Sequence, residues 1–129
     1  MNGTLSRPAI LVVDEDLGFI FWLGEIAEEI GCTCIPALNC WDAISFIRTF
    51  DLEIDLLIVN LTLAGVAEMI QTLTREQCPF QIVSSAQKMP NFLLERADQE
   101  PVARKNWIQL IKCTLGQIEH EFCLSKTPS

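Results

Sequence analysis

The sequence has no run of lysine or arginine, and basic residues are few. Nine Lys and Arg stand against 17 Asp and Glu, and the formal net charge is −8. Because affinity for nucleic acid comes largely from neutralising phosphates, direct binding of DNA or RNA is not expected. An anionic membrane surface repels the chain for the same reason. We therefore expect neither nucleic acid nor membrane lipid as a partner.

Long hydrophobic runs are also missing. No stretch approaches the roughly 18 to 20 continuous apolar residues that are needed to cross a bilayer. The segment Met1–Pro8 is polar and short, unlike the apolar core of a secretory signal. We therefore expect a cytoplasmic protein.

Metal-binding and redox residues occur without a strong motif. The one histidine, His120, falls on the polar side of a predicted helix end, where a solvated surface residue is expected rather than a ligand or a phosphate carrier. The six cysteines lie mostly inside apolar segments: Cys32, Cys34, Cys40, Cys78, Cys113 and Cys123. We interpret them as reduced thiols that act as small hydrophobic residues. The alternative is a redox or soft-metal site at Cys32, Cys34 and Cys40, but no CxxC pair supports it.

Apolar residues are abundant and make up 50% of the chain, which is enough to bury a core and unlike a disordered tail. A length of 129 residues fits one domain of ordinary size. We find no internal repeat and no linker. The sequence predicts a single domain over residues 1–129, with a core at about 8–123 and a polar tail at 124–129.

Short apolar runs alternate with segments of helical periodicity. Runs rich in β-branched residues predict strands that are buried on both faces, as in a parallel sheet, at 9–13, 32–36, 55–60 and 80–84, with a weaker edge strand at 101–104. Helical spacing predicts helices at 17–30, from the N-cap Asn39 onward, at 65–74, at about 90–100 and at 107–122. This alternation predicts an α/β fold with helices on both faces of a parallel sheet.

Polar residues follow the predicted strands at their carboxyl ends. Asp14, Glu15 and Asp16 come after the first strand, Asn60 ends the third, Ser84-Ser85 end the fourth and Lys105 follows the fifth. Ligands of open parallel sheets bind beyond this edge. Carboxylate and amide oxygens suit Mg²⁺, and a hydroxyl with a lysine can hold phosphoryl oxygens.

Four short motifs occur in the order found in response-regulator receiver domains, the phosphorylated domains of two-component signalling. They are VVDED at 12–16, IVN at 58–60, SA at 85–86 and KNW at 105–107. From Ile10 to about Phe122 the chain resembles this family. The resemblance implies a flavodoxin-like, doubly wound, five-stranded parallel sheet in the order 2-1-3-4-5.

The resemblance also assigns roles to single residues. Asp14 and Glu15 match the acidic pair that binds Mg²⁺, and Asn60 matches the aspartate that receives the phosphoryl group from a histidine kinase. Ser85 matches the hydroxyl residue that binds this group, and Lys105 matches the lysine that contacts it. The alternative interpretation needs no such roles. In it, the acids at 14–16 cap the first helix, and Lys105 is a counter-ion to Asp14 or Glu15.

Several positions depart from the family pattern. Asn60 has no carboxylate to form an acyl phosphate, and its neutral amide weakens a Mg²⁺ site. Glu15 is one methylene longer than the usual aspartate, which octahedral Mg²⁺ tolerates poorly. Ala64 and Asn106 replace two prolines, and Val102 stands where active receivers often have a mobile aromatic ring. We therefore expect a degenerate pocket at Asp14, Glu15, Asn60, Ser85 and Lys105.

The functional prediction is a degenerate receiver that is not an enzyme and acts in signal transduction through protein-protein interaction. The expected partner is a histidine kinase, an output domain or a second copy of the chain. No cofactor is expected, with a weak Mg²⁺ site at Asp14 and Glu15 as the alternative. Residual or relocated phosphoryl chemistry and a cysteine-based redox sensor are the alternative functions.

The first predicted helix carries more apolar residues than one buried stripe needs. Phe19, Trp22 and Ile26 widen its apolar arc and are candidates for an interface, including that of a homodimer. The alternative is that Phe19 and Trp22 lie flat over the edge of the domain.

Overall fold

The computed structural model describes residues 7–77, 79–87 and 100–126. Side-chain surroundings are described for residues 7–77, 79–86 and 100–116. The elements are β1 Ala9–Val13, α1 Leu17–Glu29, β2 Thr33–Ala37, α2 Cys40–Phe50, β3 Leu56–Val59, α3 Val66–Glu76, β4 Gln81–Ser84, a short 3₁₀ turn Ser85–Gln87 and α4 Glu100–Lys126. The four strands, α1 and α3 lie within two residues of their predicted bounds, and α2 begins directly after the predicted N-cap Asn39. The helix predicted at 107–122 is longer at both ends and forms α4. The helix predicted at 90–100 lies outside the described residues except for Glu100.

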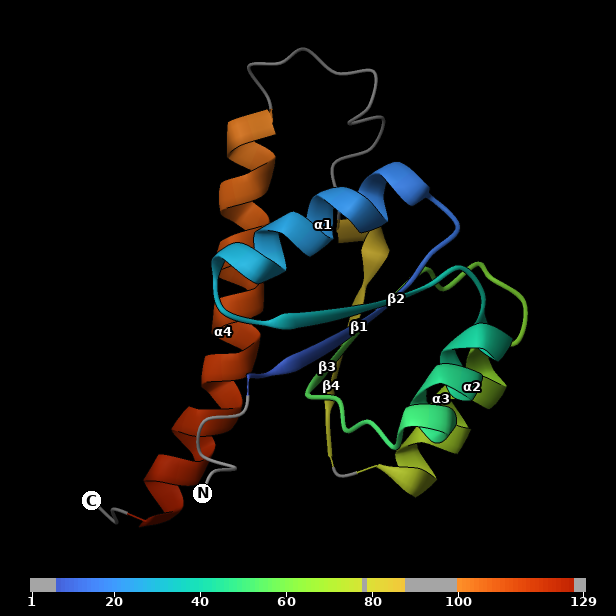
Figure 1. Ribbon diagram of the computed structural model, residues 1–129. Helices are drawn as coiled ribbons and strands as arrows, with labels where there is room; N and C mark the ends of the chain where they lie inside the picture. Colours follow the sequence, from blue (N-terminus) through green and yellow to red (C-terminus); the bar gives the residue numbers. More distant parts are fainter. Residues whose placement is uncertain (1–6, 78, 88–99, 127–129) are drawn as a thin grey trace.

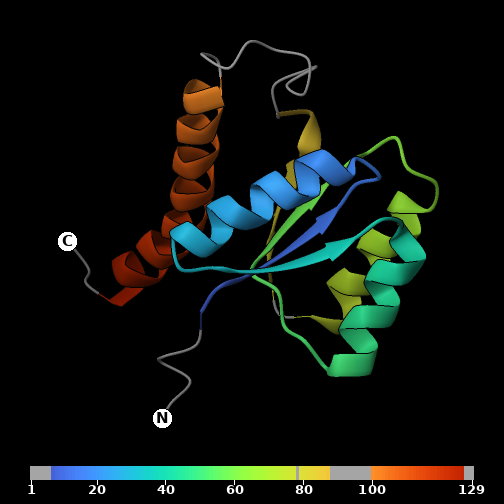
Figure 2. The same ribbon diagram turned by 45° about the horizontal axis from the view of Figure 1, so that its top comes forward.

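The strands form one parallel sheet in the order β2-β1-β3-β4. Their side chains alternate between the two faces, because successive residues of a strand point to opposite sides. Even-numbered residues of β1 and β3 pack against α1 and α4, and odd-numbered residues pack against α2 and α3. Figures 1 and 2 show these two helix layers on opposite sides of the sheet. The predicted doubly wound architecture is therefore confirmed.

The strand predicted at 101–104 is wrong, because these residues form the first turns of α4. Ala103, Trp107 and Ile111 are buried at intervals of four residues, as on one face of a helix. Val102, which a buried strand would cover on one face, is largely exposed. The described sheet therefore has four strands, and α4 continues to Lys126 into the predicted polar tail.

Three of the predicted helix ends depend on single residues. The carboxylate of Asp16 caps α1 by accepting a hydrogen bond from the backbone N–H of Phe19 at 3.1 Å. Asn39 caps α2 in the same way, with Asp42 as the donor at 2.8 Å. Gly31 follows the end of α1 with φ of 85°, a left-handed conformation that glycine adopts without strain.

The predicted interface on α1 is wrong. Phe19 and Ile26 are fully buried, and Trp22 is partly buried against the core. The reason is that α4 lies over this face of α1, with the Phe19 and Trp107 ring centroids 5.5 Å apart. The apolar arc of α1 is thus broad because it serves two neighbours, the sheet and α4. Phe21, on another side of the helix, stays exposed.

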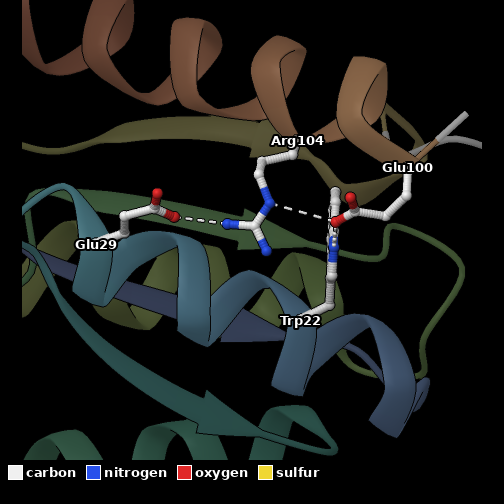
Figure 3. A network of polar contacts seen from close by, with 4 residues as sticks. All are labelled: Trp22, Glu29, Glu100 and Arg104. Atoms are coloured by element: carbon white, nitrogen blue, oxygen red, sulfur yellow. Dashed lines mark hydrogen bonds and ion pairs between the residues drawn. The ribbon is translucent and has the colours of Figure 1, made fainter. Parts of the chain in front are cut away.

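A polar network joins α1 to the beginning of α4 (Figure 3). The indole Nε1 of Trp22 donates to Oε2 of Glu100 at 2.6 Å, and Nε of Arg104 donates to the same oxygen at 3.3 Å. Arg104 also reaches Glu29 near the end of α1, with Nη1 2.6 Å from Oε1. Glu100 and Arg104 can both face α1 because a helix places residues four apart on one side. This contact favours helix over strand at 101–104.

Candidate functional site

Asp14 and Asn60 meet at the carboxyl edge of the sheet. Each follows its strand by one residue and continues the ladder: the backbone N–H of Asp14 donates to Ala37 at 3.1 Å and that of Asn60 donates to Val13 at 2.9 Å. The two side chains therefore lie next to each other, with Nδ2 of Asn60 3.3 Å from Oδ1 of Asp14. Asp14 is only 1% exposed. The sequence prediction that these residues share a site is confirmed.

The orientation of the Asn60 amide is fixed by Thr62. Oδ1 of Asn60 accepts hydrogen bonds from the backbone N–H of Thr62 at 3.0 Å and from its hydroxyl at 2.6 Å. A backbone N–H can only donate, so the atom that faces it must be the amide oxygen. The amide nitrogen therefore points at Asp14 and donates to its carboxylate.

Sequence reasoning did not predict a role for Thr62. The only signal is the spacing Asn60-x-Thr62, which is typical of an asparagine that hydrogen-bonds to the backbone two residues on.

The three acids after β1 have different surroundings. Asp14 is buried and also accepts a hydrogen bond from the backbone N–H of Asp16 at 3.1 Å. Glu15 is exposed, whereas Asp16 is the N-cap of α1. Of the two roles considered for this cluster, capping is confirmed for Asp16.

Ser85 lies at the same edge of the sheet as Asp14 and Asn60. It directly follows β4, and its side chain is buried. The hydroxyl of the neighbouring Ser84 accepts a hydrogen bond from the backbone N–H of Ala86 at 3.0 Å. Ser84 therefore stabilises the turn that leaves β4.

Lys105 does not follow a strand, so its predicted place in the pocket is wrong. It lies in the second turn of α4 and is exposed. Within the described residues, no hydrogen bond or ion pair joins it to Asp14 or Glu15. The prediction failed because it depended on a fifth strand at 101–104. Asn106 and Val102 are likewise exposed residues of α4 and not part of a loop.

The donor set around Asp14 fits a hard divalent cation poorly. Mg²⁺ requires oxygen ligands in near-octahedral geometry. Asn60 turns its nitrogen toward Asp14, and its oxygen is used by Thr62. Glu15 is solvent-exposed, which leaves one buried carboxylate. In the part of the chain that the structure describes, no group of three His, Cys, Asp or Glu is placed to hold a metal ion.

The described cysteines lie mostly in the core. Cys32 and Cys40 are buried, Cys34 is partly buried and Cys113 is exposed on α4. Cys32 and Cys34 pack on the same face of the sheet, as predicted. Burial raises the pKa of the Cys32 and Cys40 thiols and raises the pKa of Cys34 to about 11. A raised pKa leaves little thiolate, the form that reacts.

We expect alkylation by iodoacetamide at pH 8 to follow this order of burial. Among the described cysteines, Cys113 should react first, Cys34 should react more slowly because its pKa is raised, and Cys32 and Cys40 should react only at rates limited by opening of the fold. Peptide mapping by mass spectrometry over time measures each site, and urea-unfolded protein is the control. Labelling of Cys34 as fast as Cys113 would favour the redox-sensor alternative.

Among the described helices, none combines the length and the apolar character needed to cross a membrane.

No protein-family model and no curated protein sequence matches the chain. Solved structures do match. The signal receiver domain of a protein described as a Luxo repressor from Vibrio parahaemolyticus aligns over 92% of this chain and 98% of its own, with 16% identity and a TM-score of 0.64. The signal receiver domain of an HD domain-containing protein from Pseudomonas fluorescens Pf-5 aligns over 87% and 97%, with 16% identity and a TM-score of 0.59. The chain therefore has the fold of receiver domains.

Proposed function

We propose that this chain is a degenerate receiver domain that acts in signal transduction by binding another protein and carries no phosphoryl group itself. The observation that supports this most strongly is the Asn60 amide nitrogen, which faces the buried Asp14 carboxylate at 3.3 Å. Asn60 occupies the position that the sequence resemblance gives to the phosphorylated aspartate. In this proposal the protein is not an enzyme and works in the cytoplasm.

The chemistry of an amide supports the loss of phosphorylation. An acyl phosphate forms when a carboxylate oxygen attacks phosphorus, and a neutral amide offers no such anionic nucleophile. The Asn60 oxygen is also held by two hydrogen bonds from Thr62. Lys105, the expected contact for phosphoryl oxygens, is an exposed residue of α4. Two of the groups that the chemistry needs are therefore absent or displaced.

The hydrogen bond between Asn60 and Asp14 supports a binding role that does not require Mg²⁺. In receivers the ion offsets the repulsion between neighbouring carboxylates. Here the amide donor of Asn60 stabilises the Asp14 carboxylate directly. The buried Asp14 carboxylate therefore has a hydrogen-bond donor beside it, and in this proposal the domain needs no cation.

The proposal predicts that acetyl phosphate with millimolar Mg²⁺ leaves the protein unmodified. Intact-mass spectrometry should show no stable gain of one phosphoryl group, because the acceptor carboxylate is missing. A receiver domain that has the aspartate is the positive control under the same conditions. A site-specific gain on this chain, located by peptide mapping, would contradict the proposal and favour relocated phosphoryl chemistry.

In this proposal the partner is another protein. A histidine kinase, an output domain or a second copy of the chain fits a module that lacks its own switch.

A further inference from the structure

The amino-terminal ends of α2 and α3 form an apolar hollow beside the pocket. A cavity of about 80 Å³ lies between the two helices and is lined by Cys40, Trp41, Ile44, Gly65, Glu68 and Met69. The side chain of Trp41 forms one wall and is 66% exposed. Figures 1 and 2 show α2 and α3 side by side on the face of the sheet opposite α1 and α4.

The Trp41 ring packs against the backbone of Gly65. Gly65 has φ of 83°, and a Cβ added to it would lie 3.3 Å from Cζ3 of Trp41. The ring thus has bare backbone on one side and solvent on the other. Trp41 is in the first turn of α2, which Asn39 caps, so its backbone belongs to a rigid element. An exposed tryptophan beside an apolar hollow is the kind of residue that dominates the binding energy of interfaces.

Two exposed leucines and two exposed acids stand close in the sequence to the residues that line this hollow. Leu38 and Leu61 lie in the loops that lead into α2 and α3, and both are exposed. Asp42 and Glu68 are in the first turns of the two helices and are also exposed. We call these four residues, together with Trp41 and its cavity, the Trp41 surface.

Within α2 and α3, the charged side chains at this end are all acidic. The basic residues of α2 and α3, Arg48 and Arg75, are in the last turns, at the opposite end. Arg48 is already paired there with Glu76 at 2.6 Å. The helix N-termini carry partial positive charge, but Asp42 and Glu68 offset it. The Trp41 surface is therefore apolar at its centre and acidic around it.

We propose that the Trp41 surface binds a basic amphipathic helix of a partner protein. One aliphatic side chain of that helix fills the cavity, and its Lys or Arg residues lie against Asp42 and Glu68. The cavity of about 80 Å³ is large enough for the end of one such side chain and far below the 300 Å³ or more of a small-molecule site. A second copy of the chain fits poorly, because the net charge is −8 and the surface is acidic.

This inference deepens the proposed interaction role and rests on it, but binding at the Trp41 surface does not depend on phosphoryl chemistry. A failure of binding would leave the acetyl phosphate result unchanged. A phosphoryl group found by mass spectrometry would contradict the proposed function and would leave the binding measurement intact, because that measurement uses unmodified protein. The two proposals can therefore fail separately.

The test uses the full chain and a synthetic amidated peptide of about 15 residues, long enough to form a helix on a surface. Its leucines are spaced at i, i+3, i+4 and i+7, and its other residues are lysines. In ¹⁵N-labelled protein, the largest amide shifts on titration should fall within 38–44 and 61–69. A peptide with glutamate in place of lysine should not bind.

Variants locate the binding site. Trp41→Ala should weaken binding about 10-fold or more, because exposed tryptophans of this kind dominate interface energies. Phe50→Ala is the matched control, since Phe50 is 61% exposed at the far end of the same helix, and it should bind as the native chain does.

Two double variants distinguish attraction of the peptide by the acids of the Trp41 surface from attraction by the net charge of the chain. Asp42→Asn with Glu68→Gln should weaken binding and reduce its dependence on salt. Glu25→Gln with Glu53→Gln removes the same charge from exposed positions elsewhere and should have little effect. Equal effects of both double variants, or shifts that avoid the Trp41 surface, would overturn the proposal. A concentration-dependent dimer that Trp41→Ala abolishes would show that a second copy is the occupant, and would overturn it as well.

Discussion

Asn60→Asp is expected to lower the free energy of unfolding at pH 7 by about 2–4 kcal/mol in the absence of divalent cations. The substitution replaces a donor to Asp14 with a second carboxylate at a distance of 3.3 Å. Two unit charges at this distance repel by about 5 kcal/mol at an effective dielectric constant of about 20, and partial protonation relieves some of this. Urea denaturation of both proteins measures the difference.

The effect should depend on pH in a defined direction. The Asp14 charge raises the pKa of the introduced carboxyl in the folded state above its unfolded value of about 3.9. The loss of stability is therefore absent below about pH 4, grows as the pH rises toward the folded pKa and is constant above it. A loss that is equal at pH 3.5 and pH 7 would contradict charge repulsion as its cause.

Two controls test this explanation: addition of Mg²⁺, and exchange of the residues at positions 14 and 60. Millimolar Mg²⁺ should return stability to Asn60→Asp, because two adjacent carboxylates make a cation site, and should leave the native chain unchanged. The double variant Asp14→Asn, Asn60→Asp restores one carboxylate and one amide and should recover part of the loss. Stabilisation of the native chain by Mg²⁺ would show that the present pocket does hold a cation.

Trp107→Ala is expected to cost about 3–5 kcal/mol, the range for removal of a large aromatic side chain from a core. Trp107 is 2% exposed and packs on Phe19, and it joins α4 to α1 and the sheet. Its loss leaves a cavity under α4 at the same time as it removes buried apolar area. Urea or thermal unfolding followed by far-UV circular dichroism measures this change.

Two other substitutions show whether the effect comes from burial. Among the described residues, the buried indole Nε1 of Trp107 has no hydrogen-bond partner, so Trp107→Phe removes an unsatisfied donor and should cost less than about 1.5 kcal/mol. Trp41→Ala, at an exposed position, should stay within about 0.5 kcal/mol of the native chain. If Trp107→Ala were as mild as Trp41→Ala, α4 would not belong to the cooperative core.

The strands and most helix ends were predictable from the sequence because their signals are local. Uninterrupted apolar runs at 9–13 and 56–59 are typical of strands that are covered on both faces, and β1 and β3 are the two central strands. Asn39 and Gly31 mark a helix start and a helix stop through their own hydrogen bonding and backbone freedom. Such features need no knowledge of distant residues.

The errors arose where distant contacts decide between local alternatives. Residues 101–104 are too few for a clear periodicity, and the contacts of Glu100 and Arg104 with α1 favour a helix there. The error at Lys105 followed from that assignment. The apolar arc of Phe19, Trp22 and Ile26 was correctly seen as broad, but its width could not indicate that α4 covers it.

The candidate site was partly predictable for the same reason. The sequence by itself determined that Asp14 and Asn60 follow neighbouring parallel strands, and that Asn60 brings no carboxylate to the pocket. Only the tertiary structure decided which way the amide faces, because Thr62 fixes its oxygen and leaves the nitrogen for Asp14. Likewise the sequence contained Trp41, and only the fold brought its ring against Gly65, the residue before α3, at the edge of a cavity. The sequence determines local propensity and the order of the elements along the chain. The direction of a side chain depends instead on neighbours that only folding brings together.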